Sequence, residues 1–261
     1  MNETRISNWN ELQEALYANA WRADIKRFRS PYVYRGLSDA AYRLETSLMR
    51  LGGNYAQMEQ HLLRNFRKYA HRDIVERDTL WHWLSLAQHH GLPTRLLDWT
   101  VSPLVAAHFA TANTDKYNRD GAIWAIDYRK AHEMLPDRFK AALAEEGAEF
   151  FTVELLARLV ESLDDLDRIQ PEPFQLFFEP PSIDDRIVNQ FALFSVMSDP
   201  TASLSAWLED RPGLWCKIVI PAGLKWEIRD RLDQANLTER VLFPGLDGLS
   251  RWQKRYYTPR E

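Results

Sequence analysis

Polar residues that could bind an anion or assist catalysis gather in residues 89–100, which read His-His-Gly-Leu-Pro-Thr-Arg-Leu-Leu-Asp-Trp-Thr. A glycine and a proline restrict the backbone here. The two leucines would anchor the segment in the core, so we expect Arg95, Asp98 and Thr100 to be displayed from it. His89 could act as a general base, because the unperturbed pKa of histidine is about 6.5. The segment therefore predicts a functional site held on a rigid backbone.

A second candidate residue is Arg35, which stands in the triplet Tyr34-Arg35-Gly36 at the end of a strand-like segment. A guanidinium group is permanently charged and can donate two parallel hydrogen bonds to a phosphate. Arg35 could therefore bind the phosphates of a nucleotide. The alternative is structural: Arg35 and Asp98 would form a buried ion pair that only fixes the loop.

Together these segments resemble the FRG domain family, which takes its name from an aromatic-Arg-Gly signature. A second family signature is similar to residues 88–100, and a third is similar to Arg186, Gln190 and Phe194 at four-residue spacings. A closing element resembles residues 242–249. The resemblance extends from about residue 8 to about residue 257. It implies a bacterial protein of stress response or phage defence.

Two of the signatures also resemble the ADP-ribosyltransferase fold, in which a strand carries Arg and a second strand runs into a Ser-Pro-capped helix. This resemblance implies that NAD is the substrate. In the second strand, Asp98 and Trp99 replace the usual small hydroxyl residues, so the pocket differs in detail. The residues that we expect to bind the nucleotide are Tyr34, Arg35, Gly36, Arg95, Asp98, Trp99 and Thr100.

The same resemblance implies a Glu or Gln near a late strand, which steadies the ribose while positive charge develops on it. Glu239 and Gln190 both fit this role, and the sequence leaves the choice open. Arg35 and Thr100 would act with one of them, and His89 would serve as the base. A ring of Trp99 or Tyr34 could stack on the nicotinamide.

The expected function is that of an NAD-using, ADP-ribosyltransferase-like enzyme. It would cleave the nicotinamide–ribose bond and transfer ADP-ribose to a macromolecule or to water. The alternative is a non-catalytic module that binds a nucleotide or a partner. A nucleic-acid-processing enzyme is a third hypothesis, weakened by 33 basic against 37 acidic residues and a net charge of −4.

Metal and membrane partners are not expected. The adjacent histidines 89 and 90 point in different directions, and the chain has neither an HExxH nor a Cys/His pattern. Cys216 is the single cysteine, so no disulfide can form within the chain. There is no apolar signal region or run of membrane-spanning length. We therefore expect a soluble, cytoplasmic protein.

Periodicity and turn residues predict the elements that position these side chains. Ser102 and Pro103 are typical of a helix start, and residues 129–170 form a helical insertion. We predict one α+β domain over residues 1–261, with a small mixed or antiparallel sheet, ADP-ribosyltransferase-like, surrounded by helices. The expected helices are 8–29, 54–72, 78–89, 102–113 and 222–235, and the expected strands are 31–36, 121–127, 190–198, 214–220 and 240–243.

Overall fold

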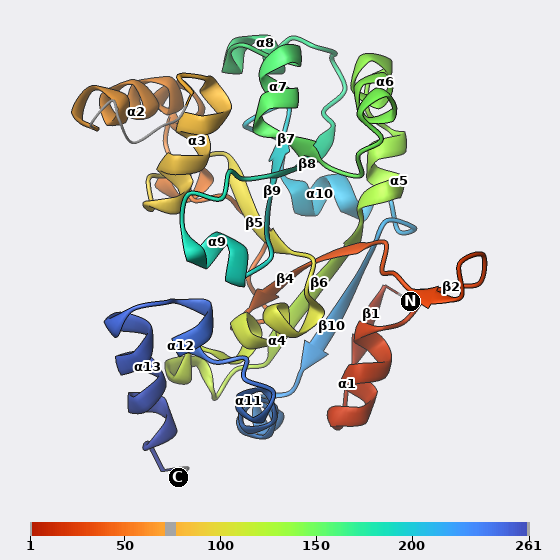
Figure 1. The fold of residues 1–261 in the computed structure, drawn as a ribbon, viewed down its shortest axis with the longest axis vertical. Helices are drawn as coiled ribbons and strands as arrows, with labels where there is room; N and C mark the ends of the chain where they lie inside the picture. Colours follow the sequence, from red (N-terminus) through yellow and green to blue (C-terminus); the bar gives the residue numbers. More distant parts are fainter. Residues whose placement is uncertain (1, 71–76, 260–261) are drawn as a thin grey trace.

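The computed structural model describes residues 2–70 and 77–259. A large mixed sheet crosses the molecule and helices surround it (Figure 1). Its strands are β1 (Glu3–Arg5), β4 (Tyr32–Leu37), β5 (Leu96–Thr100), β6 (Gly121–Asp127), β7 (Phe151–Thr152), β8 (Gln175–Glu179), β9 (Ala192–Met197) and β10 (Trp215–Ile220). Their spatial order is β1-β10-β6-β4-β5-β9-β8-β7. A separate hairpin pairs β2 (Trp21–Arg22) with β3 (Arg27–Phe28).

The prediction of an α+β fold with a mixed sheet surrounded by helices is confirmed, but the sheet is larger than expected. Strand β8 lies in the proline-flanked segment 171–181, where an apolar run of only a few residues gave no clear period. Strands β1 and β7 have three and two residues. Such short edge strands carry no alternation that a sequence could reveal.

The sheet is nearly divided between its two central strands. β4 pairs with β6 over six residues, and β5 pairs with β9 over five. In contrast, β4 and β5 pair at a single position, where Tyr34 lies opposite Thr100. The two strands therefore diverge beyond this point, which leaves backbone groups and side chains open between the two halves of the sheet.

The helices lie on both faces of the sheet and at its ends (Figure 1). The longer ones are α1 (Trp9–Leu16), α2 (Tyr55–Tyr69), α3 (Leu80–His89), α4 (Pro103–Thr111), α6 (Asp137–Glu146), α11 (Lys225–Gln234) and α13 (Leu246–Tyr256). The shorter ones are α5 (Tyr128–Glu133), α7 (Val153–Leu159), α8 (Leu163–Asp167), α9 (Asp185–Asn189), α10 (Leu204–Glu209), α12 (Glu239–Leu242), and the 3-10 turns η1 (Met49–Leu51), η3 (Thr114–Lys116) and η4 (Ala222–Leu224). None of the helices described is long and apolar enough to cross a membrane.

Helix α4 packs directly on β4, and the sequence explains this contact. The Ser102 hydroxyl accepts a hydrogen bond from the amide of Val105, and Pro103 occupies the first turn, as predicted. Gly36 allows the close approach: a Cβ atom there would lie 1.9 Å from the carbonyl oxygen of Ala106. The glycine of the aromatic-Arg-Gly triplet is therefore needed for helix–strand packing.

Two predicted elements are wrong. The helix expected over residues 8–29 ends at Leu16. Asn19 and Lys26 then adopt left-handed backbone conformations (φ 59° and 51°), which reverse the chain and form the β2–β3 hairpin. The strand expected over 240–243 is helix α12, because the Thr238 hydroxyl caps it by accepting from the amide of Val241.

The other predicted elements agree with the structure within a few residues, and the insertion over 129–170 is mainly helical. The end of the helix predicted over 54–72 lies outside the described residues. Within α2 the buried positions are Glu59 and Leu63, whereas Met58 and Tyr69 are exposed. The buried carboxylate of Glu59 has a partner in the signature segment, described below.

Candidate functional site

A cavity of about 460 Å³ opens where β4 and β5 diverge. This size is within the range of small-molecule sites. Strands β4 and β5 form one wall, and the end of α3, helix α9 and the segment after α12 contribute the others. The cavity brings together most of the predicted site residues: Tyr34, Arg35, Gly36, His89, Asp98, Trp99, Thr100 and Gln190.

The guanidinium group of Arg35 lies in the gap between the strands. Its Nη1 donates a hydrogen bond to the carbonyl oxygen of Asp98 and lies 3.6 Å from the Asp98 carboxylate. The predicted ion pair is thus present, but the Arg35 side chain is 17% exposed and that of Asp98 is 59% exposed. Both Asp98 oxygens also accept from Gln88. Asp98 therefore does not fully neutralise Arg35.

Arg35 retains hydrogen-bonding capacity for a ligand. Its buried Nε has no partner among the described residues. Burial lowers the pKa of Arg35, and the charge of Arg50 lowers it further, against the opposing effect of Asp98. The group still stays protonated at neutral pH, because the pKa of arginine starts above 12. An anion bound in the cavity would compensate the buried charge of Arg35 and offset its repulsion with Arg50.

Two further arginines line the same cavity and were not assigned to the site from the sequence. Arg186 lies in the first turn of helix α9, and its buried Nε also lacks a partner in the described chain. Arg50 stands in the 3-10 turn η1. Arg186 belongs to a family signature, which could have pointed to it. Arg50 has no recognisable sequence signal, since only the fold brings η1 beside β4.

Strand alternation places Asp98 and Thr100 on the cavity side of β5. The Thr100 hydroxyl donates to the carbonyl oxygen of Gln190 at 2.7 Å. The Trp99 indole points to the opposite face, where it donates to Ser195 and packs in the core. The hydroxyl of Tyr34 donates to the carbonyl oxygen of Leu16, and its ring is also part of the core. The two predicted stacking rings are therefore occupied in packing.

The aromatic rings available to a ligand come instead from Phe109 of α4 and Phe243 after α12. Their centroids are 6.1 Å apart. The guanidinium carbon of Arg186 lies 5.1 Å from the centre of the Phe243 ring. The site thus has an apolar surface next to its cationic groups, an arrangement that suits a ring attached to an anion.

Arg95 is not displayed, contrary to the prediction. Its side chain is buried and forms ion pairs with Glu59 of α2 at 2.7 Å and with Asp167 of α8 at 2.6 Å. It does not line the cavity. The carboxylate partners lie 36 and 72 residues away in the chain, so no local pattern could reveal that Arg95 is a structural residue.

The two candidates for the residue that acts on the ribose, Gln190 and Glu239, lie in different places. Gln190 lines the cavity, and its side-chain amide donates to the carbonyl oxygen of Leu242 at 2.8 Å. Glu239 lies outside the cavity, where both carboxylate oxygens accept from Arg255. Burial alone would raise the pKa of Glu239, but the hydrogen bonds from Arg255 and the charge of Arg229 outweigh it and lower the pKa to about 2.

His89 lines the cavity beside helix α9. Its Nε2 lies 3.3 Å from the carboxylate of Asp184, which caps α9. Burial lowers the pKa of His89, and the Asp184 charge opposes this effect. The imidazole is therefore neutral at neutral pH and able to accept a proton. In the part of the chain that the structure describes, no group of three or more His, Cys, Asp or Glu side chains could hold a metal ion.

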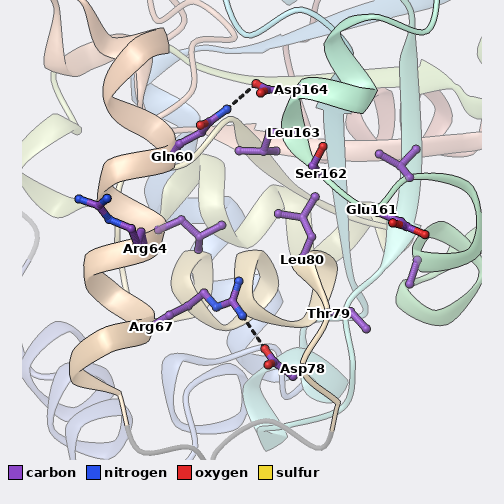
Figure 2. Close-up of a pocket in the computed structure, with 13 residues that line it drawn as sticks. Gln60, Arg64, Arg67, Asp78, Thr79, Leu80, Glu161, Ser162, Leu163 and Asp164 are labelled. Carbon is purple, nitrogen blue, oxygen red and sulfur yellow. Dashed lines mark hydrogen bonds and ion pairs between the residues drawn. The ribbon is translucent and has the colours of Figure 1, made fainter.

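A second cavity, of about 490 Å³, lies between α2, the start of α3 and helices α7 and α8 (Figure 2). Its polar residues include two pairs that hold the elements together: Gln60 donates to Asp164, and Arg67 lies 2.6 Å from Asp78. None of the residues with predicted chemistry lines it. The cavity between β4 and β5 is therefore the candidate functional site.

The fold and this site define a mixed α/β protein with a divided sheet and an arginine-lined cavity. Residues 30–119 match the model of the FRG domain family. The resemblance to this family that the signatures indicated is therefore confirmed over these residues. The matched part supplies β4, β5 and α4. Neither the curated proteins nor the solved structures compared with this chain gave a match.

Proposed function

We propose that the cavity binds NAD and that the protein cleaves its nicotinamide–ribose bond, transferring ADP-ribose to a macromolecule or to water. One observation carries this proposal. The buried Nε atoms of Arg35 and Arg186, two residues that line the same cavity, have no hydrogen-bond partner among the described residues. Buried donors of this kind are costly unless a ligand satisfies them. Arg50 adds a third positive charge.

The substrate's two phosphates would accept hydrogen bonds from Arg35 and Arg186, since planar guanidinium groups match phosphate oxygens. Phe109 and Phe243 supply apolar surface for the nicotinamide ring. The single-position pairing of β4 and β5 leaves room for the pyrophosphate between the strands. The positively charged pyridinium ring would be placed near the exposed carboxylate of Asp98.

The chemistry breaks the bond between the ribose anomeric carbon and the nicotinamide nitrogen. Nicotinamide leaves with the bonding electron pair and becomes neutral, while positive charge develops on the ribose. The side-chain oxygen of Gln190 would accept a hydrogen bond from a ribose hydroxyl, and Asp98 would stabilise the charge electrostatically. The water or acceptor that attacks the anomeric carbon loses a proton, which the neutral imidazole of His89 would accept.

The test is release of free nicotinamide from NAD by the purified protein, measured by chromatography with and without cell extract as acceptor. We expect Arg35→Lys to lower the rate about 100-fold, because lysine keeps the charge but loses the planar donor fork. Arg186→Ala should lower it similarly. Arg231→Ala, an exposed arginine of α11, is the matched control and should retain the rate.

No nicotinamide release by the wild-type protein under either condition would contradict the catalytic proposal. The alternative, a non-catalytic nucleotide-binding module, would then be supported by stabilisation without turnover. At a ligand concentration 100 times the dissociation constant, that stabilisation is about 2.7 kcal/mol. The same unpartnered arginines favour this alternative, and Arg35→Lys should then reduce the ligand-induced rise in Tm.

The family resemblance leads us to place this activity in the bacterial cytoplasm, in stress response or phage defence. A bacterium expressing the wild-type protein should survive phage challenge better than one expressing Arg35→Lys at the same level. Equal survival of the two strains would argue against a defensive role for the cavity, whatever reaction it catalyses.

A further inference from the structure

The β2–β3 hairpin carries a concentration of basic and apolar side chains that the proposed function does not use. Residues 21–30 include four cationic side chains and one carboxylate, in a chain of net charge −4. The hairpin projects from the body of the molecule (Figure 1). We refer to residues 21–29 as the basic hairpin. Its basic residues are Arg22, Lys26, Arg27 and Arg29, and its exposed apolar residues are Trp21, Ile25 and Phe28.

We propose that the basic hairpin binds single-stranded nucleic acid, with its cationic side chains on the phosphates and its aromatic rings against the bases.

Two of the four cationic groups are fully available for phosphates. No ion pair or hydrogen bond engages the side chains of Lys26 and Arg27 among the described residues, and both are exposed. Arg22 forms an ion pair at 2.6 Å with Asp24, which is the one carboxylate of the hairpin. Arg29 donates a single hydrogen bond to the carbonyl oxygen of Phe28, which leaves most of its donors open. Arginine suits phosphate recognition because its planar fork matches the oxygen geometry.

The aromatic rings are arranged to stack. Trp21 and Phe28 lie directly opposite each other in the register of β2 and β3. Their ring centroids are 5.2 Å apart and their planes meet at 62°, so the contact is edge-to-face. The residues remain 53% and 61% exposed. Ring faces are thus left open to solvent, and unpaired bases stack on such faces without sequence preference.

This chemistry favours a single strand over the other polyanionic partners. A duplex hides its base faces, so the two rings would have nothing to stack on. A bilayer surface needs a broader apolar face, whereas Ile25 is the one large aliphatic side chain exposed at the hairpin. An acidic protein offers charge but no planar bases. The combination of open rings with the free cationic groups of Lys26 and Arg27 is the feature that a single strand satisfies.

The basic hairpin is separate from the cavity. In Figure 1 it lies at the side of the molecule away from α9, which lines the cavity, and from α12, which precedes the lining residue Phe243. The proposal therefore does not depend on NAD chemistry. If both hold, the hairpin would bring a nucleic acid to an enzyme that transfers ADP-ribose to a macromolecule.

The test is fluorescence anisotropy of a labelled 20-nucleotide oligo(dT) with the full-length protein. We expect binding that weakens with rising salt, because each neutralised phosphate releases a counterion. Lys26→Glu with Arg27→Glu should raise the Kd at least 10-fold, and so should Trp21→Ala with Phe28→Ala. Arg64→Glu with Lys254→Glu reverses two exposed charges elsewhere and should change the Kd less than twofold.

Thermal unfolding of each variant shows whether the fold is retained, and substitutions at the exposed hairpin positions should leave Tm nearly unchanged.

No binding of oligo(dT) at low salt would overturn the proposal, as would hairpin variants that bind like the control pair. Equal competition by poly-L-glutamate would show that bases are not recognised. Binding to vesicles with 30% phosphatidylserine but not to oligo(dT) would assign the hairpin to a lipid surface. Nicotinamide release measured without cell extract should be unaffected by the hairpin variants, so the two proposals fail separately.

Discussion

Arg35 and Arg95 are chemically identical side chains that the fold places in opposite electrostatic surroundings. Arg95 lies between two carboxylates that neutralise it in the interior. Arg35 meets one mainly exposed carboxylate and keeps an unpartnered Nε. The residue types of the signatures predicted Arg35 as a cavity residue, but the same reasoning misplaced Arg95, because its counter-charges come from distant helices.

Substitution of Gln190 should affect mainly the reaction rate, whereas substitution of Glu239 should affect mainly the stability. Gln190→Ala removes a side-chain oxygen from the cavity, so we expect nicotinamide release to fall about 100-fold. Its Tm should change little, because one hydrogen bond, to Leu242, is lost. Glu239→Gln leaves part of the buried Arg255 charge uncompensated and should lower the free energy of unfolding by about 3 kcal/mol.

The measurements are the nicotinamide release rate per folded molecule and urea unfolding of both variants. Glu239→Gln should keep its rate within about threefold of wild type. A 100-fold loss of rate in Glu239→Gln, with the free energy of unfolding unchanged, would instead make Glu239 the residue that acts on the ribose.

Among the elements, those marked by an apolar run were predicted well, and those decided by single residues were not. Strand β6 is a continuous buried run with the predicted bounds, and helix α3 lies within the predicted residues 78–89. The end of α1 depends on the left-handed backbone of Asn19, and α12 depends on a cap by Thr238. These decisions involve one residue each, and a window of residues cannot resolve them.

The ion pair between Arg95 and Glu59 connects β5 to α2, and its contribution can be measured by a double-mutant cycle. We expect Arg95→Met alone to lower the free energy of unfolding by about 3–5 kcal/mol, because it leaves a buried carboxylate unpaired. Arg95→Met combined with Glu59→Leu should cost less than Arg95→Met alone. Asp167 is one-third exposed and can be hydrated in either case.

Urea unfolding of the two single variants and the double variant provides the cycle. If the double variant were the least stable of the three, desolvation would not be the dominant cost of the pair, and the interpretation of Arg95 as a neutralised structural residue would need to change.

At the scale of the whole molecule, the cavity depends on residues beyond the matched family segment. Residues 30–119 supply Arg35 and the strand end at Thr100, while Arg186, Gln190 and Phe243 come from later in the chain. Strand β6, which pairs with β4 over six residues, also lies outside the match. The sequence resemblance indicated this wider extent, but the order of the strands could not be predicted from it.

A fragment of residues 30–119 should therefore not fold alone. Within it, β4 and β5 would retain a single pairing position, and both would lose their main partners, β6 and β9. We expect far-UV circular dichroism of the fragment to show little strand content and no cooperative thermal transition. A cooperative transition in the fragment would show that the later strands are not needed for the matched segment to fold.

The buried histidines should make the whole molecule less stable in mild acid. Burial lowers the pKa of His132 to about 4 and that of His108 to about 3. The backbone amide of Phe177 donates to Nε2 of His132, which therefore accepts as a neutral ring. Between pH 6.5 and 4 the unfolded chain binds protons that the folded chain does not, so the free energy of unfolding falls as pH falls.

Each such histidine contributes a slope of up to about 1.4 kcal/mol per pH unit in this window, and none above pH 6.5 or so. His132→Gln removes the titrating ring and keeps a hydrogen-bond acceptor, so its stability should depend less on pH between 6 and 5, by about 1 kcal/mol. Exposed His61→Gln is the matched control and should leave the slope as in the wild type. Urea unfolding at pH 7, 6 and 5 measures all three. An unchanged slope in His132→Gln would mean that the His132 ring takes up its proton as readily in the folded protein as in the unfolded chain. Burial and the contact with the Phe177 amide would then not hold the ring neutral.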